Sequence, residues 1–173
     1  MEFYCETVYD RETMTDMAKA LRKTVRKKRN RWAHLWGGVV LAAAILLTLP
    51  HGGQAFVLDF RRIITWIAAA VVLLTMIFAD RLNGYVAKRR MLPGMERAAV
   101  TFREDGYHSE TELGSSDFKY ESIAEIVETE KFFVFIFGQN HAHAYDKCRM
   151  TGGTADEFRV FLKTVTGKDI QKV

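Results

Sequence analysis

Two long stretches of the chain are apolar at nearly every position and contain no Asp, Glu, Lys or Arg. Residues 32–49 read WAHLWGGVVLAAAILLTL, and residues 63–79 read IITWIAAAVVLLTMIFA. Because an α-helix rises about 1.5 Å per residue, each stretch covers most of a hydrocarbon core of about 30 Å. Aromatic side chains, which are common at membrane interfaces, stand near the ends: Trp32, Trp36, Phe60 and Trp66. We therefore predict two transmembrane helices joined by an external loop over residues 50–62.

Two other kinds of segment have the same apolar pattern. Buried core helices of a soluble protein are one, but a domain this small cannot surround two helices that are apolar on every side. A signal peptide is the other, and Gly53-Gln54-Ala55 resembles a small-residue cleavage site. The region before the first stretch is about thirty residues long, far longer than the basic region of a signal peptide. The pattern therefore favours a transmembrane hairpin.

The basic residues gather beside these stretches. Residues 1–94 carry 15 Lys and Arg against 7 Asp and Glu, whereas residues 95–173 carry 10 against 14. Seven of the basic residues directly precede the first stretch: Arg22, Lys23, Arg26, Lys27, Lys28, Arg29 and Arg31. Lys and Arg are retained on the cytoplasmic side of membrane helices, so we predict a multi-pass protein of the inner cell membrane with both termini in the cytoplasm. The lipid bilayer is the first predicted partner, with these seven side chains on its anionic headgroups.

A basic run can also indicate nucleic acid. A nucleic-acid surface combines the charges with a reader helix or with aromatic residues between them. Here the nearby aromatic residues, Trp32 and Trp36, lie only at the apolar end of the run. We therefore predict no nucleic-acid partner.

The segment before the first stretch carries two periodic patterns. Residues 2–9, EFYCETVY, alternate between two faces, which is typical of a strand. A lone strand is unstable in water, so we expect residues 1–9 to join a sheet formed by the C-terminal half. Asp10 suits an N-cap, and four apolar residues then share one helical face: Met14, Met17, Leu21 and Val25. This predicts an amphipathic juxtamembrane helix over residues 10–31 that continues into the membrane.

The C-terminal half changes period after Pro93-Gly94, which ends a helical extension over residues 80–94. Short alternating segments separated by turn residues predict six strands: residues 97–102, 107–113, 117–120, 122–129, 132–137 and 141–145. Thr154 and Glu157 form a capping box before an apolar helical stripe. The predicted fold is an α+β membrane protein, in which residues 95–173 form a small antiparallel β-barrel or sandwich closed by a C-terminal helix.

This order of elements resembles the YcxB-like bacterial membrane proteins. The resemblance rests on VTFREDGYHSET, YESIAEIVETEKFFVFIF, AYDKCRM and DEFRVFLK. It implies that the cytoplasmic part is similar to a pleckstrin-homology-like domain, and it implies no established activity. Classical domains of that kind hold phosphoinositides with basic residues in their first hairpin. The corresponding segment here, Arg103-Glu104-Asp105-Gly106, is acidic on balance, so we do not expect phosphoinositide binding.

The strand FFVFIF is apolar on both faces. Phe133, Phe135 and Phe137 share one face, and Phe132, Val134 and Ile136 share the other. One face must fill the interior of the sheet structure, and exposed surfaces rarely tolerate a patch as apolar as the other. We expect either the N-terminal helix or a second copy of the domain to cover it.

Candidate chemistry is sparse. His141, His143 and Cys148 are weak candidates for a metal site, because two strand histidines still lack further ligands. Lys147 and Arg149 are possible anion contacts beside the C-terminal helix. No catalytic constellation stands out, so we predict no enzyme activity and no cofactor.

The predicted function is a membrane-anchored interaction module that binds a protein partner or another copy of itself. A membrane-bound enzyme and an accessory subunit of a transporter are the alternatives. His34 is the only ionisable residue inside either apolar stretch, which disfavours an ion path through this chain.

Overall fold

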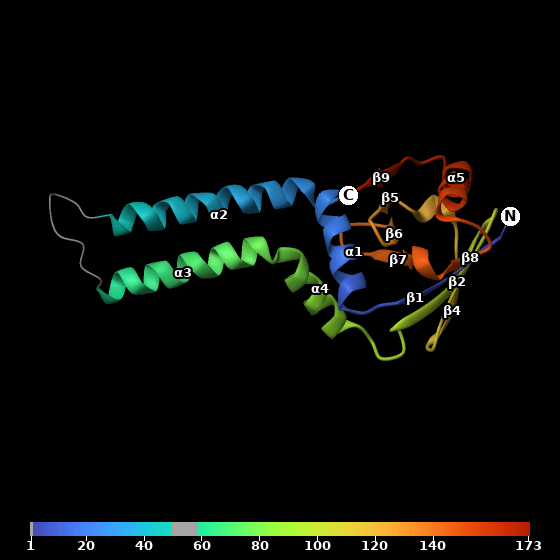
Figure 1. Ribbon diagram of the computed structural model, residues 1–173, viewed down its shortest axis with the longest axis horizontal. Helices are drawn as coiled ribbons and strands as arrows, with labels where there is room; N and C mark the ends of the chain where they lie inside the picture. Colours follow the sequence, from blue (N-terminus) through green and yellow to red (C-terminus); the bar gives the residue numbers. More distant parts are fainter. Residues whose placement is uncertain (1, 50–58) are drawn as a thin grey trace. The chain divides into compact units, whose positions relative to one another are not determined.

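The computed structural model describes residues 2–49 and 59–173, which divide into two compact units (Figure 1). Unit 1 runs from the N-terminus to Arg26 and continues over Asp80–Val173, and unit 2 is Lys27–Ala79. Most of the predicted external loop, residues 50–58, lies outside the described residues.

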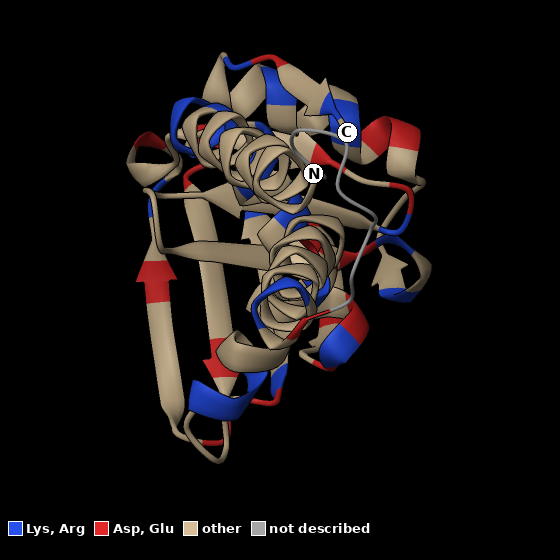
Figure 2. Ribbon diagram, turned by 90° about the vertical axis from the view of Figure 1, so that its left-hand side faces the viewer, with Lys and Arg blue, Asp and Glu red and all other residues tan. Residues whose placement is uncertain are grey.

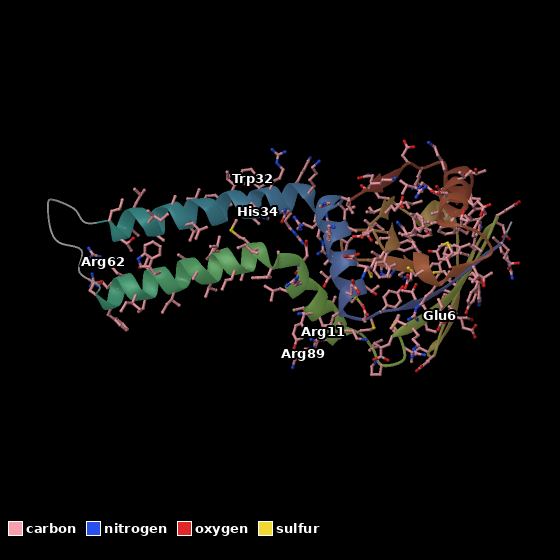
Figure 3. All side chains as sticks on the ribbon, in the orientation of Figure 1. Glu6, Arg11, Trp32, His34, Arg62 and Arg89 are labelled. Atoms are coloured by element: carbon pink, nitrogen blue, oxygen red, sulfur yellow. The ribbon has the colours of Figure 1, made fainter. Side chains whose placement is uncertain are left out.

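Unit 2 contains two helices, α2 (Lys27–Thr48) and α3 (Phe60–Ile77). Both are long and apolar enough to cross a membrane. Their charged residues stand at the starts of the helices, and Figure 3 labels one of them, Arg62. Figure 2 shows segments with Lys and Arg in blue and the uncharged residues of the two helices in tan. Gly37 of α2 faces Met76 of α3, because a Cβ at Gly37 would lie 2.5 Å from the Met76 sulfur.

The predicted continuous helix over residues 10–31 is interrupted at residues 24–26. Helix α1 spans Arg11–Lys23 and begins at the predicted N-cap, where Asp10 accepts a hydrogen bond from the Thr13 amide at 2.9 Å. It ends at Thr24, whose hydroxyl donates to the Ala20 carbonyl. Thr24 and Val25 are both β-branched, which lowers helix propensity at this point. The interruption separates the amphipathic helix of unit 1 from the apolar helix of unit 2.

The first sheet of unit 1 includes the N-terminal segment. Its strand order is β4-β3-β2-β1-β8. The strands are β1 (Phe3–Val8), β2 (Arg97–Arg103), β3 (Gly106–Thr111), β4 (Gly114–Phe118) and β8 (Met150–Thr151). β1 pairs antiparallel with β2 from Phe3↔Phe102 to Val8↔Arg97. The structure thus contains the pairing that the N-terminal alternation predicts, with β1 inside the sheet between β2 and β8.

The second sheet has the order β7-β6-β5-β9. Its strands are β5 (Glu125–Glu128), β6 (Phe132–Ile136), β7 (Ala142–Asp146) and β9 (Ile170–Lys172). The sequence patterns do not predict β9, which follows the last helix and pairs parallel with β5. The remaining elements of unit 1 are α4 (Ala79–Arg90), α5 (Ala155–Thr166), η1 (Tyr120–Ser122) and η2 (Lys147–Arg149).

The two sheets are not closed into a barrel, so the barrel form of the prediction is wrong. β7 lies against β1, but side chains rather than a strand ladder join them. The Thr7 hydroxyl accepts the Asp146 amide hydrogen at 3.1 Å, and the Cys5 thiol donates to the Asp146 carbonyl at 3.3 Å. These contacts satisfy the backbone N–H and C=O of Asp146 at the end of β7 without forming a strand ladder. The pleckstrin-homology-like assignment stays a prediction.

Both faces of β6 are buried, which explains its unbroken apolar sequence. Phe133 and Phe135 point into the main core between the sheets. Phe132, Val134 and Ile136 form a second cluster with Ala20 and Leu21 of α1. The N-terminal helix therefore covers the outer face, which confirms one of the two expected coverings.

Helix α1 is held on its other side by α4. Arg22 forms a bidentate ion pair with Asp80, with distances of 2.6 and 2.7 Å. At Gly84 a Cβ would lie 2.7 Å from the Thr15 amide nitrogen, so only glycine permits this approach. The helix is thus fixed between α4 and the second sheet.

Helix α5 begins with the predicted capping box between Thr154 and Glu157. Its inward residues fill one end of the main core. The Phe158 ring lies 4.9 Å from Phe102 and 5.2 Å from Phe133, in edge-to-face arrangements. This helix therefore closes one end of the space between the sheets.

Candidate functional site

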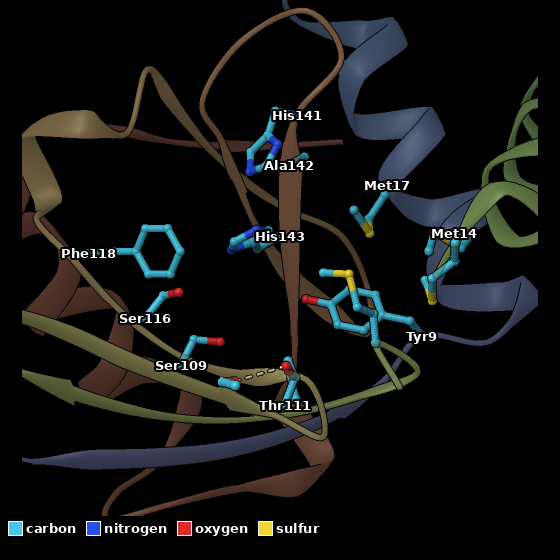
Figure 4. A pocket seen from close by; sticks show the side chains of 14 residues that line it. Tyr9, Met14, Met17, Ser109, Thr111, Ser116, Phe118, His141, Ala142 and His143 are labelled. Atoms are coloured by element: carbon cyan, nitrogen blue, oxygen red, sulfur yellow. Dashed lines mark hydrogen bonds between the residues drawn. The ribbon is translucent and has the colours of Figure 1, made fainter. Parts of the chain in front are cut away.

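A pocket opens between β4 and β7, which are edge strands of the two sheets (Figure 4). Its volume is about 370 Å³, near the lower end of the range of about 300–1,000 Å³ for small-molecule sites. All of its lining residues belong to unit 1. The pocket therefore occupies the place where a closed barrel would have paired its last two strands.

The pocket follows from a change in side-chain size along the inward face of the first sheet. At one end, Phe102, Tyr107 and Phe118 fill the interior with close ring contacts. Residues two apart on a strand share a face, so the same faces continue into the pocket. There they carry small residues: Ala98, Ser109, Thr111, Gly114 and Ser116. These side chains are too short to fill the space.

Two serine hydroxyls stand side by side on this wall. Ser109 and Ser116 are direct partners in the β3–β4 ladder, and both line the pocket. Within residues 2–49 and 59–173 neither hydroxyl makes a hydrogen bond, whereas the Thr111 hydroxyl donates to the Gly114 carbonyl at 3.0 Å. The serine pair can therefore donate to, or accept from, a bound molecule.

Histidine side chains form the edge of the pocket on β7. The His143 ring packs against Phe118 across the seam, with ring centroids 5.5 Å apart. Burial, and to a lesser extent the neighbouring His141, lower the pKa of His143 to about 4. At neutral pH the ring is therefore uncharged, with one donor and one acceptor nitrogen.

The opposite wall is built from methionines, and Figure 4 shows two of them beside Tyr9. Met14 and Met17 come from α1, and Met91 and Met95 come from the connection between α4 and β2. These are four of the seven methionines in the chain. Unbranched thioether side chains adapt to irregular shapes, so this wall is apolar and adjustable.

The described lining of the pocket contains no Asp, Glu, Lys or Arg. The acidic residues of the two polar strands, Glu110 and Asp117, take the outward positions of the β3–β4 ladder. The pocket therefore offers hydrogen bonds and apolar contact without a formal charge.

The weak metal candidates do not come together. His141 and His143 are neighbours, with ring centroids 5.0 Å apart. Cys148 is exposed and follows the opposite end of β7. In the described part of the chain, no three His, Cys, Asp or Glu side chains are placed to share a metal ion.

The candidate anion contact Lys147 has an internal partner. Its ammonium lies 2.7 Å from Glu128 Oε1, and Arg159 bonds the same carboxylate at 2.8 and 2.9 Å. The Glu128 side chain is only 7% exposed. An external anion at Lys147 would have to compete with this buried carboxylate. Arg149 is more exposed and lies 3.7 Å from Asp146.

The seven basic residues that precede the first apolar stretch divide into two groups. Arg22 pairs with Asp80, and Arg26 donates to the Gln139 carbonyl and the Asn140 side chain in the β6–β7 turn. The others are exposed: Lys23, Lys27, Lys28, Arg29 and Arg31. Five of the seven therefore stay accessible to an anionic surface.

Sequence reasoning missed the pocket itself. Its polar wall is visible in the sequence only as small residues at alternate positions, beginning two residues after Tyr107 and ending two residues before Phe118. The strand alternation alone would have placed these residues on one inward face. The methionine wall has no comparable signal, because its two segments meet only in the folded chain.

Residues 102–162 match the family model described as YcxB-like protein. The match runs from the end of β2 into α5 and includes the serine pair and both pocket histidines, but not the methionine wall. It confirms the resemblance that the sequence motifs predict. No curated protein matches the chain.

Proposed function

We propose that this chain, which is YcxB-like over residues 102–162, is a membrane-anchored module that binds a small molecule between β4 and β7. Unit 2 would supply the anchor and unit 1 the binding site. One observation carries the proposal: the inward faces of β2, β3 and β4 leave a pocket of about 370 Å³ beside a core that is otherwise filled. The pocket opens to solvent on one side, where Ser116 and His141 are exposed, so a small molecule can enter it from outside.

A protein partner or a second copy of the chain is the occupant that the sequence suggested. The reason for a second copy was the apolar outer face of β6. Because α1 covers that face within the same chain, the pocket is the better supported binding surface.

A membrane-bound enzyme is the weaker candidate. The pocket does bring serines and histidines to one place. An activated serine nucleophile needs a hydrogen bond to a general base. In the described residues no hydrogen bond joins Ser109 or Ser116 to His141 or His143. Binding is therefore the function that this geometry supports best.

The anchor is proposed to be a two-helix hairpin in the inner membrane with both termini in the cytoplasm. The five exposed basic residues between Lys23 and Arg31 and the basic end of α4 support this orientation. Lys28 and Arg31 line a groove on α2 together with Trp32 and Leu35. A groove that combines cations with apolar side chains suits an anionic lipid headgroup and the start of its acyl chain.

Thiol labelling of intact cells tests the orientation. Cys148 is exposed in unit 1, so it serves as a natural reporter for the cytoplasmic side. We expect a membrane-impermeant maleimide to leave Cys148 unlabelled in intact cells and to label it after permeabilisation. In a Gly53→Cys, Cys148→Ser variant, labelling is expected before permeabilisation. The reverse pattern would contradict the proposed topology.

Replacing Ser116 by Phe tests the pocket, because the larger side chain occupies the space that a ligand would fill. Ser115 provides the matched control, since it is the next residue on β4 and takes an outward position. We expect mass spectrometry of solvent extracts to find a compound retained by the purified wild type and by Ser115→Phe. Ser116→Phe should retain about tenfold less of this compound, because we expect its Kd to be about tenfold higher. Equal retention by the two variants would refute the pocket as the binding site.

A further inference from the structure

We propose that the ligand of this pocket is an uncharged amphiphile, meaning a molecule with a hydrocarbon body, no ionised group and a hydroxyl or carbonyl. The inference rests on the proposed function, because it specifies the chemistry of an occupant whose existence that function assumes. Three features of the lining lead to it: the absence of charge, the paired serine hydroxyls and the methionine wall.

The charge of the ligand follows from the lining. A buried ion needs an opposite charge or several well-placed hydrogen bonds to replace its hydration. The described lining contains no Asp, Glu, Lys or Arg, and burial lowers the pKa of His143 to about 4, so this ring is neutral at physiological pH. Glu110 and Asp117 point away from the pocket. A carboxylate, phosphate or ammonium group placed inside would therefore lose hydration without gaining an ion pair.

The polar group of the ligand follows from the serine pair. The Ser109 and Ser116 hydroxyls lie opposite each other on neighbouring strands, and neither has a partner among the described residues. Ser109 is half-buried and Ser116 is exposed, so water reaches them in the empty pocket. A ligand without a polar atom would displace this water and leave the covered hydroxyls without a partner, at a cost in free energy. A hydroxyl or carbonyl oxygen between them would satisfy them, so a pure hydrocarbon fits the pocket less well.

The hydrocarbon body follows from the methionine wall. Met14, Met17, Met91 and Met95 present flexible apolar surface from two separate segments. The segments are the helix that precedes α2 in the chain and the connection that follows α4. Uncharged amphiphiles concentrate in bilayers, so a protein carrying two candidate membrane spans would meet such ligands at high local concentration.

Photolabelling with three matched probes tests the ligand class. The probes share an eight-carbon chain bearing a diazirine, and they end in a hydroxyl, a carboxylate or an ammonium group. The full chain is reconstituted into phosphatidylcholine vesicles at pH 7, and labelled peptides are identified by mass spectrometry. All three probes enter the bilayer and label α2 and α3. Labelling of these two helices therefore corrects for the concentration of each probe in the membrane.

We expect the alcohol to label peptides of the pocket, with a pocket-to-span ratio about tenfold above that of either charged probe. Ser116→Phe should lower this ratio, and Ser115→Phe should not. In a Ser109→Ala, Ser116→Ala variant, the alcohol should lose its advantage over an eight-carbon hydrocarbon probe without a headgroup. The small size of these Ala substitutions keeps the strand pairing intact.

The outcomes separate the ligand class from the proposed function. Pocket labelling by the carboxylate or the ammonium probe that equals labelling by the alcohol would overturn the uncharged class and leave a binding pocket. An alcohol preference that survives loss of both serine hydroxyls would overturn the role of the serine pair. If no probe labels the pocket, or if both Phe variants behave like the wild type, the proposed function fails as well.

Discussion

Replacing Val134 by Asp is expected to unfold most of unit 1. Val134 is completely buried on the outer face of β6, where Ala20 and Leu21 of α1 pack on it. A carboxylate at this position would have no cation or hydrogen-bond donor within the apolar cluster. We expect the free energy of unfolding to fall by about 4 kcal/mol or more, the range associated with burying an unpaired charge.

The matched control is Val160→Asp on α5. Val160 is 68% exposed, so an added carboxylate stays hydrated and the free energy of unfolding should change by less than about 1 kcal/mol. The three tryptophans, Trp32, Trp36 and Trp66, all lie in unit 2, so their fluorescence does not report on unit 1. Hydrogen exchange of β6 and β7 amides, followed by mass spectrometry, is the suitable measurement. Unchanged protection in Val134→Asp would show that α1 does not cover this face in solution.

Replacing Glu128 by Gln is expected to cost about 3–5 kcal/mol, because it leaves two partly buried cations without their carboxylate. Lys147 and Arg159 both bond this side chain, and Arg159 does so with two nitrogens. The neighbouring Glu130→Gln is the control, since Glu130 is exposed. Similar denaturation midpoints for the two variants would show that the buried ion pairs contribute little to stability.

The same carboxylate predicts a dependence of stability on pH. Hydrogen bonds from Arg159 and then from Lys147, opposed by burial, lower the pKa of Glu128 from 4.5 to about 2. A lowered folded-state pKa means that the carboxylate stabilises the fold fully above about pH 4.5. This contribution is lost as the pH falls from about 4.5 to about 2, and it amounts to roughly 3 kcal/mol. We expect the free energy of unfolding of the wild type to fall by this amount between about pH 4.5 and about pH 2. The free energy of unfolding of Glu128→Gln should not show this contribution.

Sequence patterns predicted the elements whose structure depends mainly on residues nearby in the chain. The Thr154 capping box begins α5, and the N-terminal alternation forms a strand. The apolar sequence of β6 predicted that both of its faces would be covered, and left open whether a helix or a second copy would do so. That choice depended on where α1 lies, which is fixed by distant contacts such as Arg22–Asp80 and Gly84 against Thr15.

The features that the sequence did not predict depend on contacts between distant segments. The break at Thr24 allows α1 to lie along β6 and β7. The low helix propensity of Thr24 and Val25 was too weak a signal to predict the position of this break. β9 has only three residues, too few for a sequence pattern. It pairs with β5 because α5 brings the C-terminal segment back beside that strand. The pocket needs the β3–β4 register to set Ser109 opposite Ser116. Glu128 has one local signal in the sequence, because it directly follows the apolar pair Ile126 and Val127 on a predicted strand.

The position of β1 inside its sheet has a consequence for the order of biosynthesis. Phe3 pairs with Phe102, so both candidate membrane spans are translated between a central strand and its partner. At about 5–20 residues per second, the N-terminal strand waits roughly 5–20 s before β2 leaves the ribosome. During this interval its apolar residues have no sheet to join, and the first sheet is completed only after both spans have been synthesised. The proposed membrane insertion of the hairpin can therefore take place before unit 1 has a complete first sheet.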